Sequence, residues 1–411
     1  MGKADDKCSF CGKTRKDVKL LISGVSGAIC DSCTEQAFEI AQEEKHRKKG
    51  SAFHLDEKDF PKPEAIKRFL DEYVIGQDEA KKFLSVAVYN HYKRLMQKDL
   101  KDDVEIEKSN IIMVGATGTG KTLLARTIAR KLSVPFCIVD ATVFTEAGYV
   151  GEDIESILTR LLQAADYDVA ATQRGIVFID EIDKIARKSD NPSITRDVSG
   201  EGVQQGLLKL LEGSVVNVPP QGGRKHPEQR MISIDTKNIL FICGGAFDGI
   251  EKKIAKRLNT RVVGYTASRN TMSSLDVNDM LKYITPTDLK SFGLIPEIIG
   301  RLPILTYLNP LEKDALKRIL TEPKNSIIKQ YKKLFEMDNI KLTFDDDVYD
   351  YVVDKSIEFK LGARGLRSIV EAIMMDAMFE MPSGTQKKLH VTLQYAKDNF
   401  ENVDVSRLQI A

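Results

Sequence analysis

The hydrophobic and polar positions in the middle of the chain alternate between short apolar runs and longer segments with helical spacing. The runs lie at residues 110–115, 135–140, 175–180 and 238–243. Segments 121–132 and 152–171 between them have the periodicity of helices. Because continuous apolar strands separated by helices are typical of a parallel sheet covered on both faces, the pattern predicts an α/β domain over residues 64–309.

The pattern changes after Pro310. Helices are predicted over residues 311–336, with an interruption near Pro323, and over 345–357 and 363–380, and short strands at 341–344 and 389–393. We therefore expect a small, mostly helical C-terminal domain over residues 310–411.

Two cysteine pairs stand out near the start of the chain, Cys8-x-x-Cys11 and Cys30-x-x-Cys33. Two such pairs can supply four thiolates to one tetrahedral zinc ion, and a segment this short needs a metal or another cross-link to fold. The spacing predicts a structural zinc site in a domain that, with a charged linker, spans residues 1–50.

The composition narrows the class of protein. The chain has 411 residues, and 61 Lys and Arg against 60 Asp and Glu leave a formal net charge of +1. This balance argues against strong non-specific electrostatic binding to nucleic acid or to an anionic membrane. The absence of Trp leaves few aromatic side chains on which bases could stack. No run approaches the ~20 apolar residues of a membrane span. We expect a cytoplasmic protein with reduced thiols, in which Cys137 and Cys243 are small core residues.

Residues 115–122 match the phosphate-loop pattern G-x-x-x-x-G-K-[ST], between a predicted strand and a predicted helix. The loop consists of Gly115, Ala116, Thr117, Gly118, Thr119, Gly120, Lys121 and Thr122, and we include Leu123 in the nucleotide site. Backbone N–H groups of such a loop surround phosphates, Lys121 reaches the β- and γ-phosphates, and Thr122 holds Mg²⁺. The motif predicts binding of ATP or GTP.

An acidic pair, Asp180 and Glu181, follows the third apolar run. One carboxylate at a strand end can hold Mg²⁺ and a second can polarise the attacking water, so we assign Asp180 to the metal and Glu181 to the general base. Asp183 is left as either a helix cap or a supporting group. This pair favours nucleotide hydrolysis over simple switching.

Together these features resemble the AAA+ ATPases, and further motifs are similar to those of the Clp unfoldases, which feed substrates to the peptidase ClpP. The further motifs are Gly148-Tyr149-Val150-Gly151, Arg224-Lys225-His226, Gly300-Arg301-Leu302-Pro303 and Gly362-Ala363-Arg364-Gly365-Leu366-Arg367, beside the four-cysteine domain. The resemblance covers nearly the whole chain. It implies a homohexameric ring that hydrolyses ATP with Mg²⁺ to unfold proteins and to translocate them through an axial channel.

The resemblance also assigns roles at the nucleotide. It places Val74 and Ile75 against the adenine, although this segment alone looks like the turn before a helix. It makes Arg301 the arginine finger that reaches the ATP of a neighbouring subunit, and Arg364 the residue that reports the γ-phosphate to the small domain. Without the motifs, both arginines would be taken for surface or ion-paired side chains. The segment 238–247 occupies the sensor-1 strand position, and we assign no residue there.

The channel residues implied by the resemblance are Tyr149, Val150, Arg196, Arg224, Lys225 and His226. An aromatic ring between glycines offers apolar contact to any polypeptide on a loop that can swing. Three cations at the channel entrance would attract a peptide carboxylate on a tagged substrate. On sequence alone, Gly148-Tyr149-Val150-Gly151 also fits a turn at the end of a strand, and Arg224-Lys225-His226 also fits a solvated basic turn.

Docking of ClpP is implied for Val263-Gly264-Tyr265, where the family has an aliphatic residue, Gly, and Phe or Leu. The tyrosine keeps the ring but adds a hydroxyl that needs a partner in an apolar cleft. The zinc domain of the family dimerises and captures substrates and adaptor proteins. Phe10, Leu20 and Leu21 could serve that purpose, but we favour them as the small core of the domain.

Three other functions fit parts of the sequence. The first is an AAA+ ATPase that remodels nucleic acid, which the balanced charge and the channel tyrosine disfavour. The second is a self-contained protease, for which the chain has neither a His-Glu-x-x-His stretch nor a spare domain. The third is a zinc-bearing interaction module fused to a regulatory ATPase.

Overall fold

The computed structural model describes residues 7–24, 27–38, 60–97, 104, 106–145, 152–186, 200–219, 231–262, 277–359 and 361–401. The chain divides into two compact units, Met1–Leu55 and Asp56–Ala411. None of the helices in the described ranges is both long enough and apolar enough to cross a membrane.

The first unit is built on a small hairpin. Strand β1 (Leu21–Ser23) pairs antiparallel with β2 (Ala28–Cys30), and residues 31–38 are helical. The expectation that Phe10 and Leu20 form its core is wrong, because their side chains are 74% and 57% exposed. Among the residues of this unit that the structure describes, the buried apolar positions are instead Cys8, Cys30 and Ala28. The cysteine cluster therefore occupies the place that a hydrophobic core would take in a larger domain.

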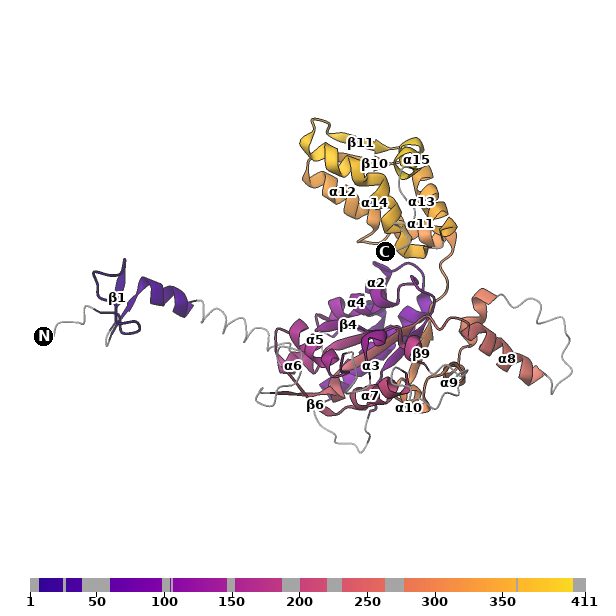
Figure 1. The fold of residues 1–411 in the computed structure, drawn as a ribbon, viewed down its shortest axis with the longest axis horizontal. Coiled ribbons are helices and arrows are strands. Elements are labelled where there is room, and N and C mark those ends of the chain that lie inside the picture. The colour runs from indigo at the N-terminus through magenta and orange to yellow at the C-terminus, as the bar shows by residue number, and fades with distance from the viewer. Residues whose placement is uncertain are drawn as a thin grey trace. The chain divides into compact units, whose positions relative to one another are not determined.

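Five parallel strands form the central sheet of the second unit, in the order β4-β5-β8-β3-β9 (Figure 1). Their bounds are β3 (Ile111–Val114), β4 (Phe136–Asp140), β5 (Ile176–Asp180), β8 (Leu240–Gly245) and β9 (Ile304–Tyr307). The four apolar runs that were predicted as strands are all present, which confirms the parallel sheet. The edge strand β9 was not predicted.

The other elements of this large domain surround the sheet. They are α2 (Pro63–Asp71), α3 (Asp78–Met96), α4 (Lys121–Leu132), η1 (Ala141–Val143), α5 (Ser156–Ala164), α6 (Val169–Thr172), η2 (Ile182–Ile185), α7 (Glu201–Glu212), β6 (Val215–Val218), β7 (Ile232–Asp235), η3 (Thr236–Asn238), α8 (Ile250–Val262), η5 (Val277–Tyr283), α9 (Pro286–Phe292) and α10 (Pro296–Arg301). Strands β6 and β7 form a separate antiparallel hairpin.

Both faces of the sheet are covered, because every residue of β3 and of β8 is buried. Alternate residues such as Ile112 and Phe241 pack in one apolar cluster with side chains of α5 and α7. On the other side, α3 and α4 contact the sheet, and Met113 is equally buried. Cys137 and Cys243 are buried, as predicted, and burial raises the pKa of each thiol to about 12.

The single long helix predicted over residues 152–171 is wrong. Helix α5 ends at Ala164, and α6 begins only at Val169. Between them, Asp166 and Tyr167 have φ values of 50° and 63°, in the left-handed region that ends a helix. Asp168 then caps α6 by accepting a hydrogen bond from the backbone N–H of Ala171 at 3.0 Å.

The small C-terminal domain has its own apolar core, and the predicted helices and strands are present. A last helix, over residues 393–401, was not predicted. Its elements are α11 (Lys313–Thr321), α12 (Ile327–Met337), β10 (Lys341–Phe344), α13 (Asp346–Glu358), α14 (Gly362–Glu380), η6 (Met381–Ser383), β11 (Lys388–Val391) and α15 (Leu393–Glu401). The strands β10 and β11 pair in parallel. The predicted interruption near Pro323 separates α11 from α12. Figure 1 shows the helices of this domain gathered around the short two-stranded sheet.

Candidate nucleotide site and zinc centre

The phosphate loop connects the end of β3 to the start of α4. Gly118 and Gly120 have φ values of 83° and 103°, which glycine adopts without strain. A β-carbon at Gly115 would lie 2.9 Å from the carbonyl oxygen of Leu308, so the loop also passes close to the backbone after β9. The curled backbone and the N-terminus of α4 form the usual setting for a bound phosphate. Leu123, in the first turn, is 47% exposed.

Lys121 lies inside this loop. Its Nζ donates hydrogen bonds to the carbonyl oxygens of Gly115 at 2.6 Å and of Ala116 at 3.1 Å. Burial lowers the pKa of this amine, while the carboxylates of Asp180 and Asp183 act in the opposite direction. The amine is thus held beside the loop backbone and facing the acidic end of β5.

Thr122 and Asp180, the two predicted Mg²⁺ ligands, are brought into contact. The hydroxyl of Thr122 donates a hydrogen bond to Oδ2 of Asp180 at 3.0 Å, although 58 positions separate them in the chain. The parallel arrangement explains this contact, because β5 and β3 both end at the edge of the sheet where α4 begins. A hydroxyl and a carboxylate side by side are an oxygen donor set that suits Mg²⁺.

Glu181 follows at once in an unusual backbone conformation, with φ of 56°. Its side chain is exposed, so the carboxylate is accessible to water. Asp183 does not cap a helix: it is buried and its Oδ1 accepts a hydrogen bond from the N–H of Ala246 at 3.1 Å. Asp183 therefore ties the acidic segment to the end of β8. The sequence had no signal for this link.

The segment at Val74 and Ile75 lies beside the phosphate loop. Both side chains are buried, and a β-carbon at Gly120 would lie 3.9 Å from Cγ1 of Val74. The turn interpretation also holds, because Gln77 is the residue before α3 and has φ of 60°. Sequence reasoning missed the side chain of Gln77, whose amide donates to the carbonyl of Asn309 and accepts from its N–H, both at 2.8 Å.

The small domain reaches the nucleotide site through the first turn of α14. A β-carbon at Gly118 would lie 3.7 Å from the backbone nitrogen of Ala363. Next to it, Arg364 is exposed, and its charge contributes to the lowered pKa of Lys121 after the larger effect of burial. Arg301, at the end of α10, is instead paired with Glu212, with 3.0 Å between Nη2 and Oε1.

The four cysteines of the first unit form one cluster. The Sγ atoms of Cys8, Cys11, Cys30 and Cys33 all lie within 4.8 Å of one another. The Sγ atoms of Cys11 and Cys30 are 3.6 Å apart, close to the edge of about 3.8 Å of a tetrahedron with zinc–sulfur bonds of about 2.3 Å. The N–H of Cys30 also donates to Sγ of Cys8 at 3.3 Å.

The thiols in this cluster differ in acidity. Backbone N–H groups, first that of Cys11, lower the pKa of Cys8 to about 6, whereas hydrogen bonding with Cys11 and Cys30 raises the pKa of Cys33 to about 12. The four donors fit the predicted structural zinc.

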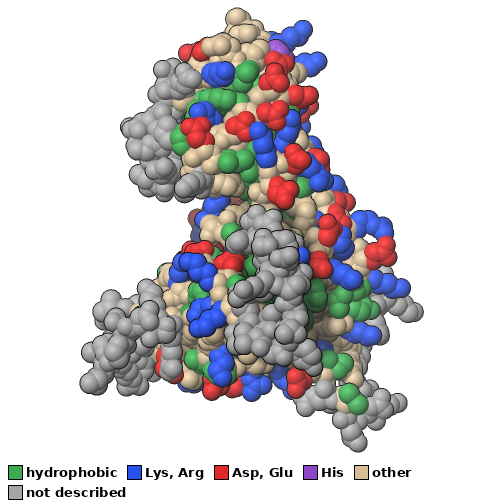
Figure 2. Space-filling model, turned by 90° about the vertical axis from the view of Figure 1, so that its right-hand side faces the viewer, with side chains coloured by type: hydrophobic (Ala, Val, Ile, Leu, Met, Phe, Trp, Pro, Cys, Tyr) green, Lys and Arg blue, Asp and Glu red, His purple; other side chains and the backbone are tan. Residues whose placement is uncertain are grey.

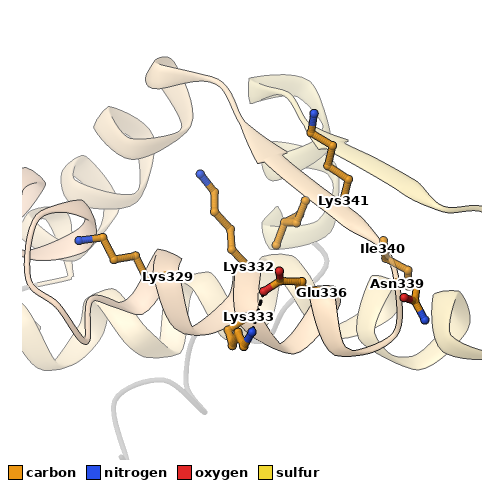
Figure 3. A pocket seen from close by; sticks show the side chains of 8 residues that line it. Lys329, Lys332, Lys333, Glu336, Asn339, Ile340 and Lys341 are labelled. Carbon is orange, nitrogen blue, oxygen red and sulfur yellow. Dashed lines mark hydrogen bonds and ion pairs between the residues drawn. The ribbon is translucent and has the colours of Figure 1, made fainter.

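The channel and docking residues lie outside the described residues. They are Tyr149, Val150, Arg196, Arg224, Lys225, His226, Val263, Gly264 and Tyr265. One further hollow, of about 510 Å³, lies beside α12 in the small domain and is lined by lysines such as Lys332 and Lys341 (Figure 3). Another of its four lysines, Lys333, pairs with Glu336 at 2.9 Å, and no residue of the phosphate loop lines the hollow.

Three family models match the chain in the order that the fold suggests. They are the ClpX C4-type zinc finger over residues 6–43, the AAA domain (Cdc48 subfamily) over 106–305 and the C-terminal, D2-small domain, of ClpB protein over 311–393. The fold and the nucleotide site thus define an AAA+ ATPase with an N-terminal zinc finger, which confirms the fold class.

The relatives narrow the class to one family. The chain is 74% identical to the ATP-dependent Clp protease ATP-binding subunit ClpX of Bacteroides thetaiotaomicron, over 100% of this chain and 99% of that protein. It is 73% identical to the protein of the same name from Bacteroides fragilis, over 98% of each chain, and 70% identical to that from Porphyromonas gingivalis, over 98% of each. The chain belongs to the ClpX family.

Proposed function

We propose that this protein is an ATP-driven protein unfoldase that hydrolyses Mg-ATP and delivers unfolded substrates to the ClpP peptidase. The observation that carries the proposal is the nucleotide site, where Thr122 and Asp180 meet beside the phosphate loop and Ala363 of the small domain lies against Gly118. A change at the phosphates therefore has a direct route to the small domain. The cleavage of peptide bonds belongs to the partner peptidase.

The proposal assigns the following roles to the site residues. Val74 and Ile75 contact the adenine, residues 115–123 hold the phosphates, Thr122 and Asp180 hold Mg²⁺, and Glu181 activates water. Six copies form a ring in which Arg301 completes the site of its neighbour and Arg364 passes the change to the small domain. The Mg²⁺ ion neutralises the charge of the phosphates, and zinc holds the first unit together.

The channel supplies the mechanical step. Tyr149 and Val150 move with the large domain and pull on the threaded chain, while Arg196, Arg224, Lys225 and His226 hold or attract it. A folded substrate resists with a stability of ~5–15 kcal/mol, so a stable substrate needs repeated cycles of hydrolysis. Docking through Val263-Gly264-Tyr265, capture of tagged substrates and adaptors by the zinc domain, and a cytoplasmic location complete the proposal.

The test is degradation of a tagged fluorescent protein with ATP, with and without ClpP. We expect fluorescence to be lost with ATP and peptides to appear only when ClpP is present. Glu181→Gln should bind ATP and form rings but barely hydrolyse, and Tyr149→Ala should keep ATPase activity and lose unfolding. Vigorous ATP consumption with fully fluorescent substrate would reject the unfoldase.

Remodelling of nucleic acid is the alternative that the surface argues against. In the view of Figure 2, Lys and Arg side chains are interspersed with Asp and Glu, without a broad region of one sign. The formal net charge of +1 agrees with this distribution. Salt-sensitive binding of single-stranded DNA at micromolar protein would revive this alternative.

A further inference from the structure

Helices α7 and α10 are fastened together at the beginning of α10 by a buried amide. Gln204 of α7 is fully buried, and its Oε1 accepts the N–H of Ile295, the residue before α10, at 2.8 Å. Its Nε2 donates to the carbonyl of Ile185 at 2.8 Å, at the end of the short helix that follows Asp180 and Glu181. One side chain of α7 thus holds both the acidic segment and the entry to α10.

A second buried amide fastens the other ends of the same two helices. Nδ2 of Asn110 donates to the carbonyl of Arg301 at 3.0 Å and to that of Leu211 at 3.3 Å. Its Oδ1 accepts the N–H of Phe241 at 3.2 Å. Asn110 is 1% exposed and directly precedes β3, the strand that leads to the phosphate loop. The backbone of Arg301 is therefore fixed to the rigid centre of the domain.

The guanidinium of Arg301 is held by the last residue of α7. Nε and Nη2 of Arg301 donate to the same Oε1 of Glu212, at 3.2 and 3.0 Å. Both side chains remain about half exposed, so the pair lies at the surface and contributes little to folding. Within the described part of the chain, Nη1 of Arg301 has no partner and stays free to meet a phosphate. The contact with Glu212 is therefore suited to orienting the side chain of Arg301 rather than to stabilising the domain.

We propose that Glu212 is a positioning residue for Arg301: it presents the guanidinium to the ATP of the neighbouring subunit, while Asn110 fixes the backbone that carries it. The inference rests on the proposed function, in which Arg301 acts across the subunit boundary. A misplaced catalytic group can cost a large factor in rate without weakening substrate binding.

The test begins with Glu212→Gln in the full chain. We expect kcat for ATP hydrolysis to fall about tenfold with little change in the KM for ATP, because the guanidinium of Arg301 is no longer held in position while the nucleotide pocket stays intact. Adding Glu212→Gln to Arg301→Ala should lower the rate no further. The matched control is Glu358→Gln, which removes an exposed carboxylate from the last residue of α13 and from its pair with Lys355 at 2.9 Å. This control should keep the wild-type rate, and a wild-type rate in Glu212→Gln would reject the inference.

Mixed rings separate an effect on the neighbour from damage within one subunit. Subunits with Glu181→Gln should barely hydrolyse ATP themselves but carry an intact Glu212 and Arg301, so they should restore hydrolysis in adjacent Glu212→Gln subunits. Arg301→Ala mixed in the same way tests the proposed function itself. If Arg301→Ala is restored and Glu212→Gln is not, Glu212 acts within its own subunit and the inference alone is wrong. If Arg301→Ala is not restored, the role of Arg301 across the boundary is wrong and the inference falls with it.

Discussion

The two compact units are stabilised in different ways. In the ATPase unit, every residue of β3 and β8 is buried between layers of helices. In the zinc unit, Phe10 is 74% exposed and the buried positions include Cys8 and Cys30. Apolar periodicity therefore encodes the first kind of fold, whereas the spacing of four thiols encodes the second. The units should respond differently to loss of metal, loss of apolar volume and change of pH.

Removal of zinc should have the largest effect and should be confined to the first unit. A structural zinc contributes apparent binding free energies of about 10–16 kcal/mol in small domains, which is far more than the few buried side chains here can replace. Chelation should collapse the dispersion of amide signals from residues 7–38 in NMR spectra. Thermal unfolding of the ATPase unit should stay unchanged, and a parallel loss of both units would contradict the comparison.

Loss of an aromatic ring from the core should destabilise the ATPase unit and leave the zinc unit unchanged. Phe178 is fully buried in β5, and a β-carbon at Gly244 of β8 would lie 2.7 Å from its Cζ. We expect Phe178→Ala to lower the free energy of unfolding of the ATPase unit by about 3–5 kcal/mol, since it leaves a cavity in a packed sheet. Denaturant unfolding measures this, with zinc content as the readout for the first unit. The matched control is Phe379→Ala, whose ring is 84% exposed and whose loss should cost little.

The fold was largely predictable because its strands are uninterrupted apolar runs. Residues 111–114 and 176–179 carry no polar side chain, and Asp180 follows the second run. Such uninterrupted apolar runs indicate strands that are buried on both faces, and therefore a parallel sheet. The break between α5 and α6 was missed because it depends on left-handed backbone at Asp166 and Tyr167, neither of which is a glycine. The exposure of Phe10 was missed because composition does not show that metal ligands replace a core.

The candidate site was predictable where one short motif holds the chemistry. The phosphate loop and the four cysteines are local patterns, and the contact of Thr122 with Asp180 follows from strand order. The amide of Gln77 on Asn309 and the carboxylate of Asp183 on Ala246 were not predictable, because each joins segments that are distant in the chain. Glutamine and aspartate side chains in turns can form hydrogen bonds with many partners, and the tertiary fold determines which partner is present.

A fall in pH should lower the stability of the ATPase unit through protonation of His91 in the unfolded chain. This ring is buried, Nε2 lies 3.1 Å from the carbonyl oxygen of Asn238, and burial followed by the charges of Arg94 and Lys108 lowers its pKa to about 3. Between that value and the unfolded value of about 6.5, the unfolded chain binds the extra proton, so stability falls as the pH falls. We expect His91 to account for a loss of about 2 kcal/mol between pH 7.5 and 5.

Denaturant unfolding at a series of pH values measures this slope. Carboxylates contribute equally to the wild type and to His91→Gln, so the difference between their slopes isolates His91. Equal slopes would show that the ring binds its proton as readily in the folded protein as in the unfolded chain.

The smallest effect should come from Phe10→Ser in the zinc unit. If metal rather than apolar area stabilises this unit, removing a ring that is 74% exposed should change its stability by no more than about 0.5 kcal/mol. Competition with a chelator measures this, since zinc release reports unfolding of the unit. Ala28→Ser provides the comparison, because it places a hydroxyl at a position that is only 6% exposed and should release zinc more readily. A cost of about 3 kcal/mol or more for Phe10→Ser would mean that the ring is a core residue after all.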